Sequence, residues 1–169
     1  MPYDISIIRP QIQANDVQLR GEGVSLARQN SIKKALRTLH TLELTATNIY
    51  KYQITSEKSE LNRHLIMAMC NEMTHYQDFQ VKLYEYGSRP NCLRWAYYIV
   101  GAVLGCWSRI RGEKAILETG IWVETKAVNH YGQLLKEVEW DDETRRIVEK
   151  NQADEDGHIA RWRKLLETI

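Results

Sequence analysis

Four stretches of this chain repeat apolar residues at helical spacing, and in the middle of each apolar stripe stand polar groups where core residues are expected. An ionised carboxylate is costly to bury without a partner, so a fold that buries these stripes must also bring the carboxylates together. The polar residues are Glu43 in the first stretch, Glu72 and His75 in the second, Glu124 in the third, and Glu155 and His158 in the fourth.

The chain is expected to be all-α. Gly and Pro are scarce, at 9 and 3 of 169 residues, and the apolar period is helical throughout the patterned region. Residues 1–29 are weakly patterned and are expected to form an arm or a short leading helix, so that the bundle spans residues 30–169. The expected helices begin near Asn30 with Ser31 as a candidate cap, run from about Ser56 to Tyr86, run from Glu113 to about Val138, and begin again at Asp141 or Asp142.

The connection between the second and third helices sets the topology. It contains residues 95–107, an apolar segment with the sequence WAYYIVGAVLGCW, and is longer than the other connections. This order predicts a ferritin-like four-helix bundle with one long crossover and an extra apolar helix.

The polar groups form an internal repeat. A lone Glu is followed by an E-x-x-H pair, and the two copies are separated by 29 residues (Glu43 to Glu72) and 31 residues (Glu124 to Glu155). Positions i and i+3 share a helix face, so each pair can reach one metal ion. A single E-x-x-H is usually solvated surface, but four carboxylates on apolar stripes in the same order predict a dinuclear carboxylate site. Oxygen ligands with imidazole suit two iron ions, or manganese as the alternative.

Composition bears on the binding partners and the cellular compartment of the protein. The formal net charge of +1 gives no indication of nucleic-acid binding. The three cysteines have no CxxC spacing, which fits a reducing cytoplasm. No run reaches the roughly 20 apolar residues that a spanning helix needs, and the N-terminus lacks an apolar signal core.

Residues 95–107 have two interpretations. They could cap the bundle as buried core, or they could lie in a membrane interface, with Trp95 and Trp107 at the ends and Arg94, Arg109 and Arg111 just outside. The second interpretation is favoured and predicts contact with a membrane surface or a lipophilic substrate. It places the protein in the cytoplasm, peripherally on the inner face of the cell membrane, and apolar surface outside the bundle also allows a homodimer.

Three further residues have open roles. His40 lies one turn before Glu43 and either orients it or is an ordinary half-buried histidine. His130 and Tyr131 follow Glu124 by about two turns; core packing is the plain interpretation for Tyr131, and a proton relay is the sharper one.

Several motifs together resemble the demethoxyubiquinone hydroxylases of ubiquinone biosynthesis, a branch of the ferritin-like di-iron proteins, over about residues 35–168. The stretch RTLHTLELTATNIYKYQ resembles the first metal helix of that family, RPNCLRWAYYIVGAVLG its Arg-Pro segment and apolar helix, VETKAVNHYGQLL its third helix, and DEDGH its last metal pair. The sequence departs from the family pattern at Leu42 (usually Gly), Thr125 (often acidic) and Ile159 (often His). None of these changes removes a candidate ligand.

The resemblance implies a di-iron monooxygenase that hydroxylates a demethoxyubiquinone-type polyprenyl quinol with dioxygen. NADH or the quinol itself would supply electrons, and His130 and Tyr131 would lie near the substrate and relay protons and electrons. The competing function is a ferritin-like or rubrerythrin-like ferroxidase or peroxide scavenger, although the chain lacks the CxxC pairs of a rubredoxin module. A third alternative is a lipid-bound accessory protein without turnover.

Overall fold

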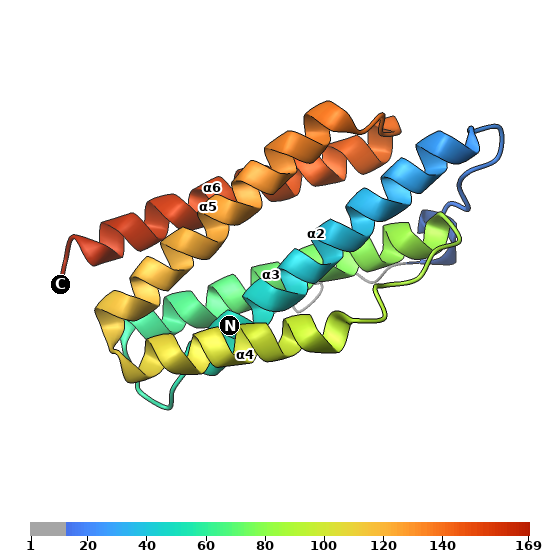
Figure 1. The fold of residues 1–169 in the computed structure, drawn as a ribbon. Helices are drawn as coiled ribbons and strands as arrows, with labels where there is room; N and C mark the ends of the chain where they lie inside the picture. The colour runs from blue at the N-terminus through green and yellow to red at the C-terminus, as the bar shows by residue number, and fades with distance from the viewer. Residues whose placement is uncertain (1–12) are drawn as a thin grey trace.

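The computed structural model describes residues 13–169, and within that range the protein is built from helices alone. This confirms the expected all-α class, and the arrangement is a helical bundle of the ferritin-like type (Figure 1). The elements are the short 3-10 helix η1 (Ala14–Asp16) and the α-helices α2 (Leu26–Gln53), α3 (Glu60–Glu85), α4 (Arg94–Ile110), α5 (Glu113–Glu137) and α6 (Asp142–Leu166).

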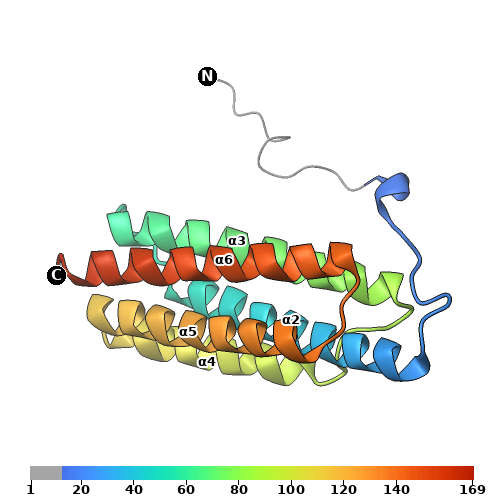
Figure 2. The ribbon, with the colours of Figure 1, turned by 90° about the horizontal axis from the view of Figure 1, so that it is seen from above.

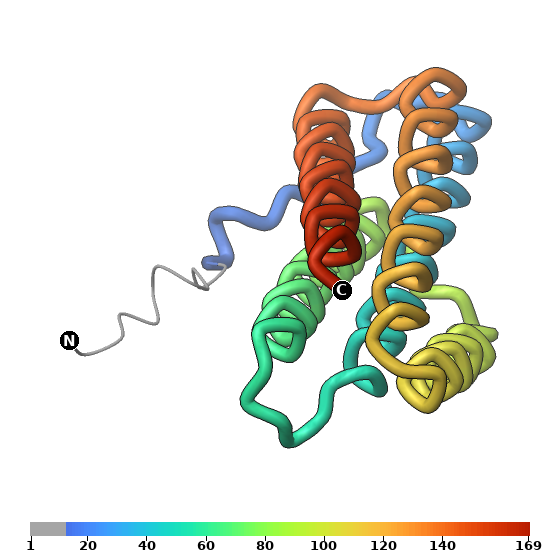
Figure 3. The backbone as a smooth tube through the Cα atoms, turned by 90° about the vertical axis from the view of Figure 1, so that its left-hand side faces the viewer, coloured from blue at the N-terminus to red at the C-terminus, as the bar shows by residue number. Residues whose placement is uncertain are grey.

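Two antiparallel hairpins form the bundle. Helices α2 and α3 pair with each other, as do α5 and α6, and the hairpins face each other through α2 with α5 and α3 with α6 (Figures 2 and 3). Helix α4 carries the chain back along the outside of α2 and also touches α5. It is the expected long crossover with an extra apolar helix.

The helix starts follow their capping residues. The Ser25 hydroxyl accepts from the Arg28 N–H, so α2 begins four residues before the expected start at Asn30, and Ser31 lies inside the helix. Ser59 caps α3 in the same way, which corrects the expected start near Ser56. Asp141 caps α6, as one of the two sequence alternatives proposed. The early start of α2 was missed because its first turn carries few apolar residues, whereas α3 begins later than expected, directly after its cap Ser59.

Two apolar clusters flank the middle of the bundle. The layer between them holds the buried polar groups, so the core is interrupted where the sequence stripes are interrupted. One cluster contains Leu36, Leu39, Phe79, Leu83, Tyr131 and Val148, and the other contains Tyr50, Leu65, Ala68, Ile116, Leu117 and Trp162.

Helix α4 lies unusually close to α2. A Cβ atom added at Gly101 would lie 2.5 Å from the Thr45 carbonyl oxygen, and one at Gly105 would lie 2.5 Å from that of Ile49. The buried Ser108 hydroxyl also accepts a 2.8 Å hydrogen bond from Gln53 Nε2. The two glycines therefore allow the backbones of α2 and α4 to touch.

The outward side of α4 is apolar and exposed. Its large side chains have 50% or more of their surface accessible at Ile99, Val100, Val103, Trp107 and Ile110, and Trp95 is 61% exposed. No helix among the described residues has the length and apolar character needed to cross a membrane. The exposed apolar face thus belongs to a helix packed along the bundle.

A charged network ties the segment before α2 to the end of the bundle where α3 ends and α6 begins. The Arg20 guanidinium donates 2.7 Å and 2.8 Å hydrogen bonds to Glu85 and Asp141 and also pairs with Glu143. The ammonium of Lys82 lies between Glu85 and Glu143, at 2.7 Å and 2.6 Å. These ion pairs hold the end of α3 against the start of α6.

Candidate metal centre

The six polar residues of the interrupted stripes meet in the middle of the bundle. Glu43 comes from α2, Glu72 and His75 from α3, Glu124 from α5, and Glu155 and His158 from α6. Each has at most 1% of its surface exposed. The structure therefore brings together every candidate ligand that the sequence repeat suggested.

The six residues divide into two sets of four that share two carboxylates. Glu43 and His75 belong to the first set, Glu124 and His158 belong to the second, and Glu72 and Glu155 belong to both. Within each set one ligand atom per residue can be chosen so that all lie within 4.8 Å of one another. Two metal ions bridged by Glu72 and Glu155 would fit this arrangement.

The imidazoles face the shared carboxylates across the two hairpins. Nδ1 of His75 lies 3.0 Å from Glu155 Oε1, and Nδ1 of His158 lies 3.0 Å from Glu72 Oε1. The unshared carboxylates are slightly farther away, with His75 Nδ1 at 3.7 Å from Glu43 and His158 Nδ1 at 3.5 Å from Glu124. The two halves are thus related by an approximate twofold.

Several buried atoms of this cluster lack hydrogen-bond partners within the described protein. They are both carboxylate oxygens of Glu72, Oε2 of Glu124 and of Glu155, and Nδ1 of His158. Buried polar groups are normally satisfied, so several unsatisfied ones at one point are groups that an ion could satisfy. Four carboxylates and two imidazoles supply the charge and donor types that suit two divalent ions, so the residues fit a dinuclear metal centre.

The electrostatics of the cluster are strongly coupled. Burial raises the pKa of Glu43 and of Glu124 well above the ordinary value, and the neighbouring carboxylates add to the effect. Burial would also raise the pKa of Glu72, but the imidazoles of His158 and His75 outweigh it and lower that pKa. Burial would lower the pKa of His158, but the three facing carboxylates raise it to about 12. Without metal, protons take the place of cations in this cluster.

Two buried tyrosines repeat the same symmetry. The Tyr131 hydroxyl on α5 donates a 2.5 Å hydrogen bond to Glu43 on α2, and the Tyr50 hydroxyl on α2 donates to Glu124 on α5. Each tyrosine follows the lone Glu of its own helix by seven residues. Sequence reasoning missed the role of Tyr50, although this equal spacing was a signal that could have shown it.

The halves differ in the residues around the tyrosines. Trp162 Nε1 donates a 3.1 Å hydrogen bond to the Tyr50 hydroxyl. The aromatic neighbour of Tyr131 is Phe79, with ring centroids 5.9 Å apart, and Phe79 has no group that can donate. Trp162 therefore polarises the hydroxyl of Tyr50, whereas Phe79 cannot do the same for the hydroxyl of Tyr131.

Asn71 and Asp154 contact the outer nitrogens of the histidines. His75 Nε2 donates to Asp154 Oδ2 at 3.2 Å, and the Asn71 side-chain amide lies 3.1 Å from His158 Nε2. Each of these residues directly precedes a shared Glu, on the hairpin opposite its histidine. Both were missed in the sequence, where a polar residue beside an E-x-x-H motif looks like surface.

The remaining candidates lie at different depths. His40 is fully buried, but its Nε2 lies 3.4 Å from Gln80 and its ring lies tilted against that of Tyr76 at 4.3 Å, so it does not contact Glu43 through any described bond. His130 lies on the exposed side of α5 and donates a 2.8 Å hydrogen bond to the Lys126 carbonyl. Of the expected relay pair, the structure brings only Tyr131 to the cluster.

Two cavities that share lining residues lie on the α4 side of the cluster. A cavity of about 120 Å³ between α2, α4 and α5 is lined by Glu43 itself, with Val100, Leu104 and Trp122. A second, of about 300 Å³, lies between α4 and α5, and it shares Leu104 and Trp122 with the first and adds Trp107. The smaller cavity thus has one candidate ligand, Glu43, in its wall.

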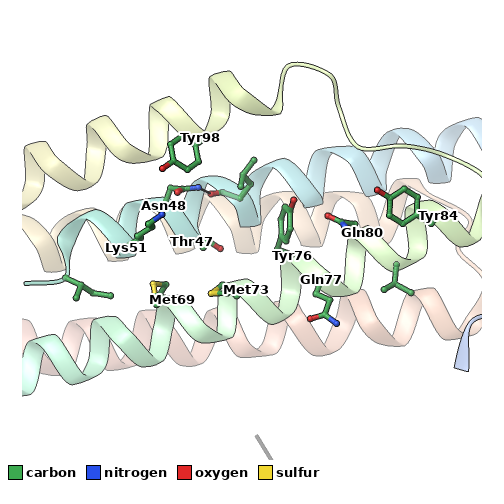
Figure 4. A pocket seen from close by; sticks show the side chains of 13 residues that line it. Thr47, Asn48, Lys51, Met69, Met73, Tyr76, Gln77, Gln80, Tyr84 and Tyr98 are labelled. Carbon is green, nitrogen blue, oxygen red and sulfur yellow. Dashed lines mark hydrogen bonds between the residues drawn. The ribbon is translucent and has the colours of Figure 1, made fainter. Parts of the chain in front are cut away.

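A groove much larger than these two cavities lies on another side of the bundle. It has a volume of about 1090 Å³ and runs along α2 and α3, with Tyr98 of α4 at its rim (Figure 4). Met69, Met73 and Tyr76 line it from α3, and none of the six candidate ligands does. Its size alone does not connect it to the metal centre.

The fold and the six converging side chains define a ferritin-like bundle with a candidate dinuclear carboxylate centre. Residues 30–163 match the model of the family described as "Ubiquinone biosynthesis protein COQ7", and the chain belongs to this family. The family resemblance seen in the sequence is thereby confirmed.

Curated relatives carry one activity in their names. The chain is 26% identical over 137 residues to the 3-demethoxyubiquinol 3-hydroxylase of Legionella pneumophila (strain Paris), covering 80% of this chain and 64% of the relative. It is 28% identical over 133 residues to the mitochondrial NADPH-dependent 3-demethoxyubiquinone 3-hydroxylase of Dictyostelium discoideum, covering 76% and 61%. The chain thus spans less than two thirds of the length of these relatives.

Proposed function

We propose that this protein is a di-iron monooxygenase that hydroxylates a demethoxyubiquinone-type polyprenyl quinol with dioxygen. The observation that carries the proposal is the pair of four-residue sets sharing Glu72 and Glu155 in a member of the COQ7 family. The names of the relatives supply the substrate class. Electrons would come from a reduced nicotinamide or from the quinol.

The six converging residues would hold the two metal ions. Glu43 and His75 would bind one ion, Glu124 and His158 the other, and Glu72 and Glu155 both. Bound iron would supply the activation of dioxygen, a chemistry that oxygen ligands with imidazole support; manganese is the alternative ion. The protein side chains fix the ligand geometry and keep water out, since all six are buried.

The cavities next to α4 would admit the substrate. The 120 Å³ cavity is lined mostly by apolar side chains, which suits a methylated quinol ring, and the adjoining space between α4 and α5 suits an isoprenoid tail. Tyr131 donates to the same Glu43 and is the group placed to hold a proton where the ring would arrive. His130, on the outer face of α5, would reach a proton only after a movement of its side chain.

The exposed face of α4 would rest on the membrane that dissolves such a substrate. Trp95 and Trp107 lie on it, and the guanidinium of Arg111 stacks over the Trp107 ring at 4.7 Å. Aromatic side chains with adjacent arginines are typical of an interfacial helix on anionic lipid. The protein would then act in the cytoplasm, on the inner face of the cell membrane. The alternative is that the same face of α4 forms the interface of a homodimer.

The test combines metal content with oxygen uptake. Purified protein is expected to hold about two irons per chain and to consume dioxygen only when a short-chain demethoxyquinone and NADH are both added. The variant Glu72→Ala/Glu155→Ala serves as the metal-free control. Two irons with no response to the quinone, but with rapid oxidation of added ferrous iron or rapid reduction of added peroxide, would replace the hydroxylase by a ferroxidase or a peroxide scavenger.

A further inference from the structure

The two halves of the metal centre differ in charge at one pair of equivalent positions. Asp154 of α6 accepts from Nε2 of His75 at 3.2 Å, and the amide nitrogen Nδ2 of Asn71 on α3 lies 3.1 Å from Nε2 of His158. The approximate twofold of the hairpins exchanges these two contacts. One histidine is therefore backed by a carboxylate and the other by a neutral amide.

This difference matters because the other ring nitrogen of each histidine faces the metal position. In both residues Nδ1 points to the shared carboxylates, so a metal on Nδ1 leaves the hydrogen on Nε2. A carboxylate that accepts this hydrogen bond makes the imidazole a stronger donor to the metal. An amide oxygen, reached in Asn71 by a half-turn of its side chain, accepts more weakly because it carries no charge.

The tyrosines bias the centre in the same direction. Tyr50 donates to Glu124 while it accepts from Trp162 Nε1, and that second bond strengthens its pull on the carboxylate. Tyr131 donates to Glu43 beside Phe79, which offers no such donor. Glu124 thus shares more of its charge with a hydrogen-bond donor than Glu43 does.

From these contacts we infer that the two metal positions are unequal, and that the position held by Glu43 and His75 fills first and binds its ion more tightly. Asp154 and Asn71 are the positioning residues that set this order. The inference rests on the dinuclear centre of the proposed function and deepens it by assigning an order to the two ions. It does not depend on which organic substrate is used.

The experiment loads metal-free protein with one equivalent of Mn(II) and locates the ion by anomalous diffraction. The expected peak lies beside His75, and a Mn(II) titration is expected to resolve two affinities that differ by about tenfold or more. Equal peaks at both positions, or a stronger peak beside His158, would overturn the inference. This measurement needs no variant.

A charge swap tests the cause of the order. Asn71→Asp/Asp154→Asn keeps the total charge and is expected to move the first Mn(II) to the position beside His158. The control Asp156→Asn removes a carboxylate from the exposed side of the same helix and should leave the order unchanged. An order that survives the swap would contradict the role of the two positioning residues.

The outcomes separate this inference from the proposed hydroxylase. Ordered loading without quinone-dependent oxygen uptake would keep the inference and remove the proposed substrate. Quinone-dependent uptake with equal affinities would do the reverse. Failure to bind Mn(II) or Fe(II) at all would refute both.

Discussion

Tyr131 on α5 donates a 2.5 Å hydrogen bond to Glu43 on α2, and so links the two hairpins at the candidate metal centre. The same link runs in the opposite direction from Tyr50 to Glu124. Each bond fixes a carboxylate that has no access to water. These two hydrogen bonds therefore hold the two hairpins together, in addition to any role of the cluster in binding metal ions.

Removing either phenol should therefore destabilise the metal-free protein. Tyr131→Phe leaves a buried carboxylate oxygen without its donor, which costs about 1–3 kcal/mol. Tyr50→Phe should cost at least as much, since Trp162 Nε1 also loses its acceptor. Urea unfolding measures both changes. Tyr52→Phe is the control, because its hydroxyl bonds only Tyr98 at the surface; equal losses for Tyr131→Phe and Tyr52→Phe would contradict the argument.

Metal binding should release protons and should strengthen as the pH rises. Without metal, the facing carboxylates raise the pKa of His75 and His158 above the ordinary histidine value, and burial raises the pKa of Glu43 and Glu124. All four groups must lose their protons to act as ligands, so about two to four protons should leave as two ions enter. A pH indicator in weakly buffered Mn(II) titrations counts them. A metal affinity that is flat between pH 6 and 8 would be evidence against this charge state.

The close contact between α4 and α2 predicts opposite effects for two Gly→Ala substitutions. At Gly101 the new Cβ would meet the Thr45 carbonyl at 2.5 Å, and backbone on both sides has little room to move. A loss of about 1–3 kcal/mol is expected, with displacement of α4. At Gly157, on the exposed side of α6, a Cβ would meet nothing within 4 Å, so Gly157→Ala should stabilise the protein by about 0.5–1 kcal/mol. Thermal unfolding of both variants decides the matter, and similar changes in both would rule out close packing at Gly101.

The network at Arg20 predicts a specific loss of stability in acid. Burial would raise the pKa of Asp141, but hydrogen bonds from Thr144 and Tyr86 and the charge of Arg20 lower it to about 2. Its contribution is present above the ordinary aspartate pKa near 3.9 and is lost as the pH falls toward 2. Because Asp141 is partly solvated, the contribution is discounted to about 1 kcal/mol.

Asp141→Asn isolates that charge, since Asn also caps a helix well. The difference in unfolding free energy between the wild type and this variant should be about 1 kcal/mol at pH 6 and should shrink toward zero near pH 2. Taking the difference removes the acid titration of the metal centre, which both proteins share. A difference that stays constant with pH would show that the cap geometry, and not the charge, is responsible.

The candidate metal centre was readable from the sequence because its candidate ligands stand where a core residue is expected. A carboxylate in an apolar stripe at Glu43 or Glu124 violates the helix pattern, and the i,i+3 spacing of Glu72 and His75 adds a shared direction. The sequence also correctly predicted the long crossover. An apolar run between two helices of a bundle can bury one of its faces only by packing against the bundle.

The contacts around the ligands could not be read in this way. Asp154 and Asn71 act across the bundle, on histidines 79 and 87 residues away in the chain, and a helix pattern carries no information about such pairs. The start of α2 was missed because Ser25 caps it through one hydrogen bond and no apolar periodicity marks the first turn. His130 was grouped with Tyr131 because the family resemblance implied a shared role, but neighbouring residues on a helix point about 100° apart.

The exposed face of α4 predicts binding to anionic membranes, and its two terminal tryptophans provide the most direct test. Trp95→Ser/Trp107→Ser removes two side chains that are 61% and 51% exposed on a helix of well-packed backbone. Affinity for liposomes containing phosphatidylglycerol should fall by about tenfold or more, because the lost apolar area no longer leaves water. The control Leu26→Ser/Ile66→Ser removes two exposed apolar side chains of α2 and α3 and should bind as the wild type does. Co-sedimentation measures the liposome binding of all three proteins, and gel filtration measures their oligomeric state. A dimeric wild type, a monomeric tryptophan variant and unchanged liposome binding would together show that this face joins two copies of the chain and does not meet lipid.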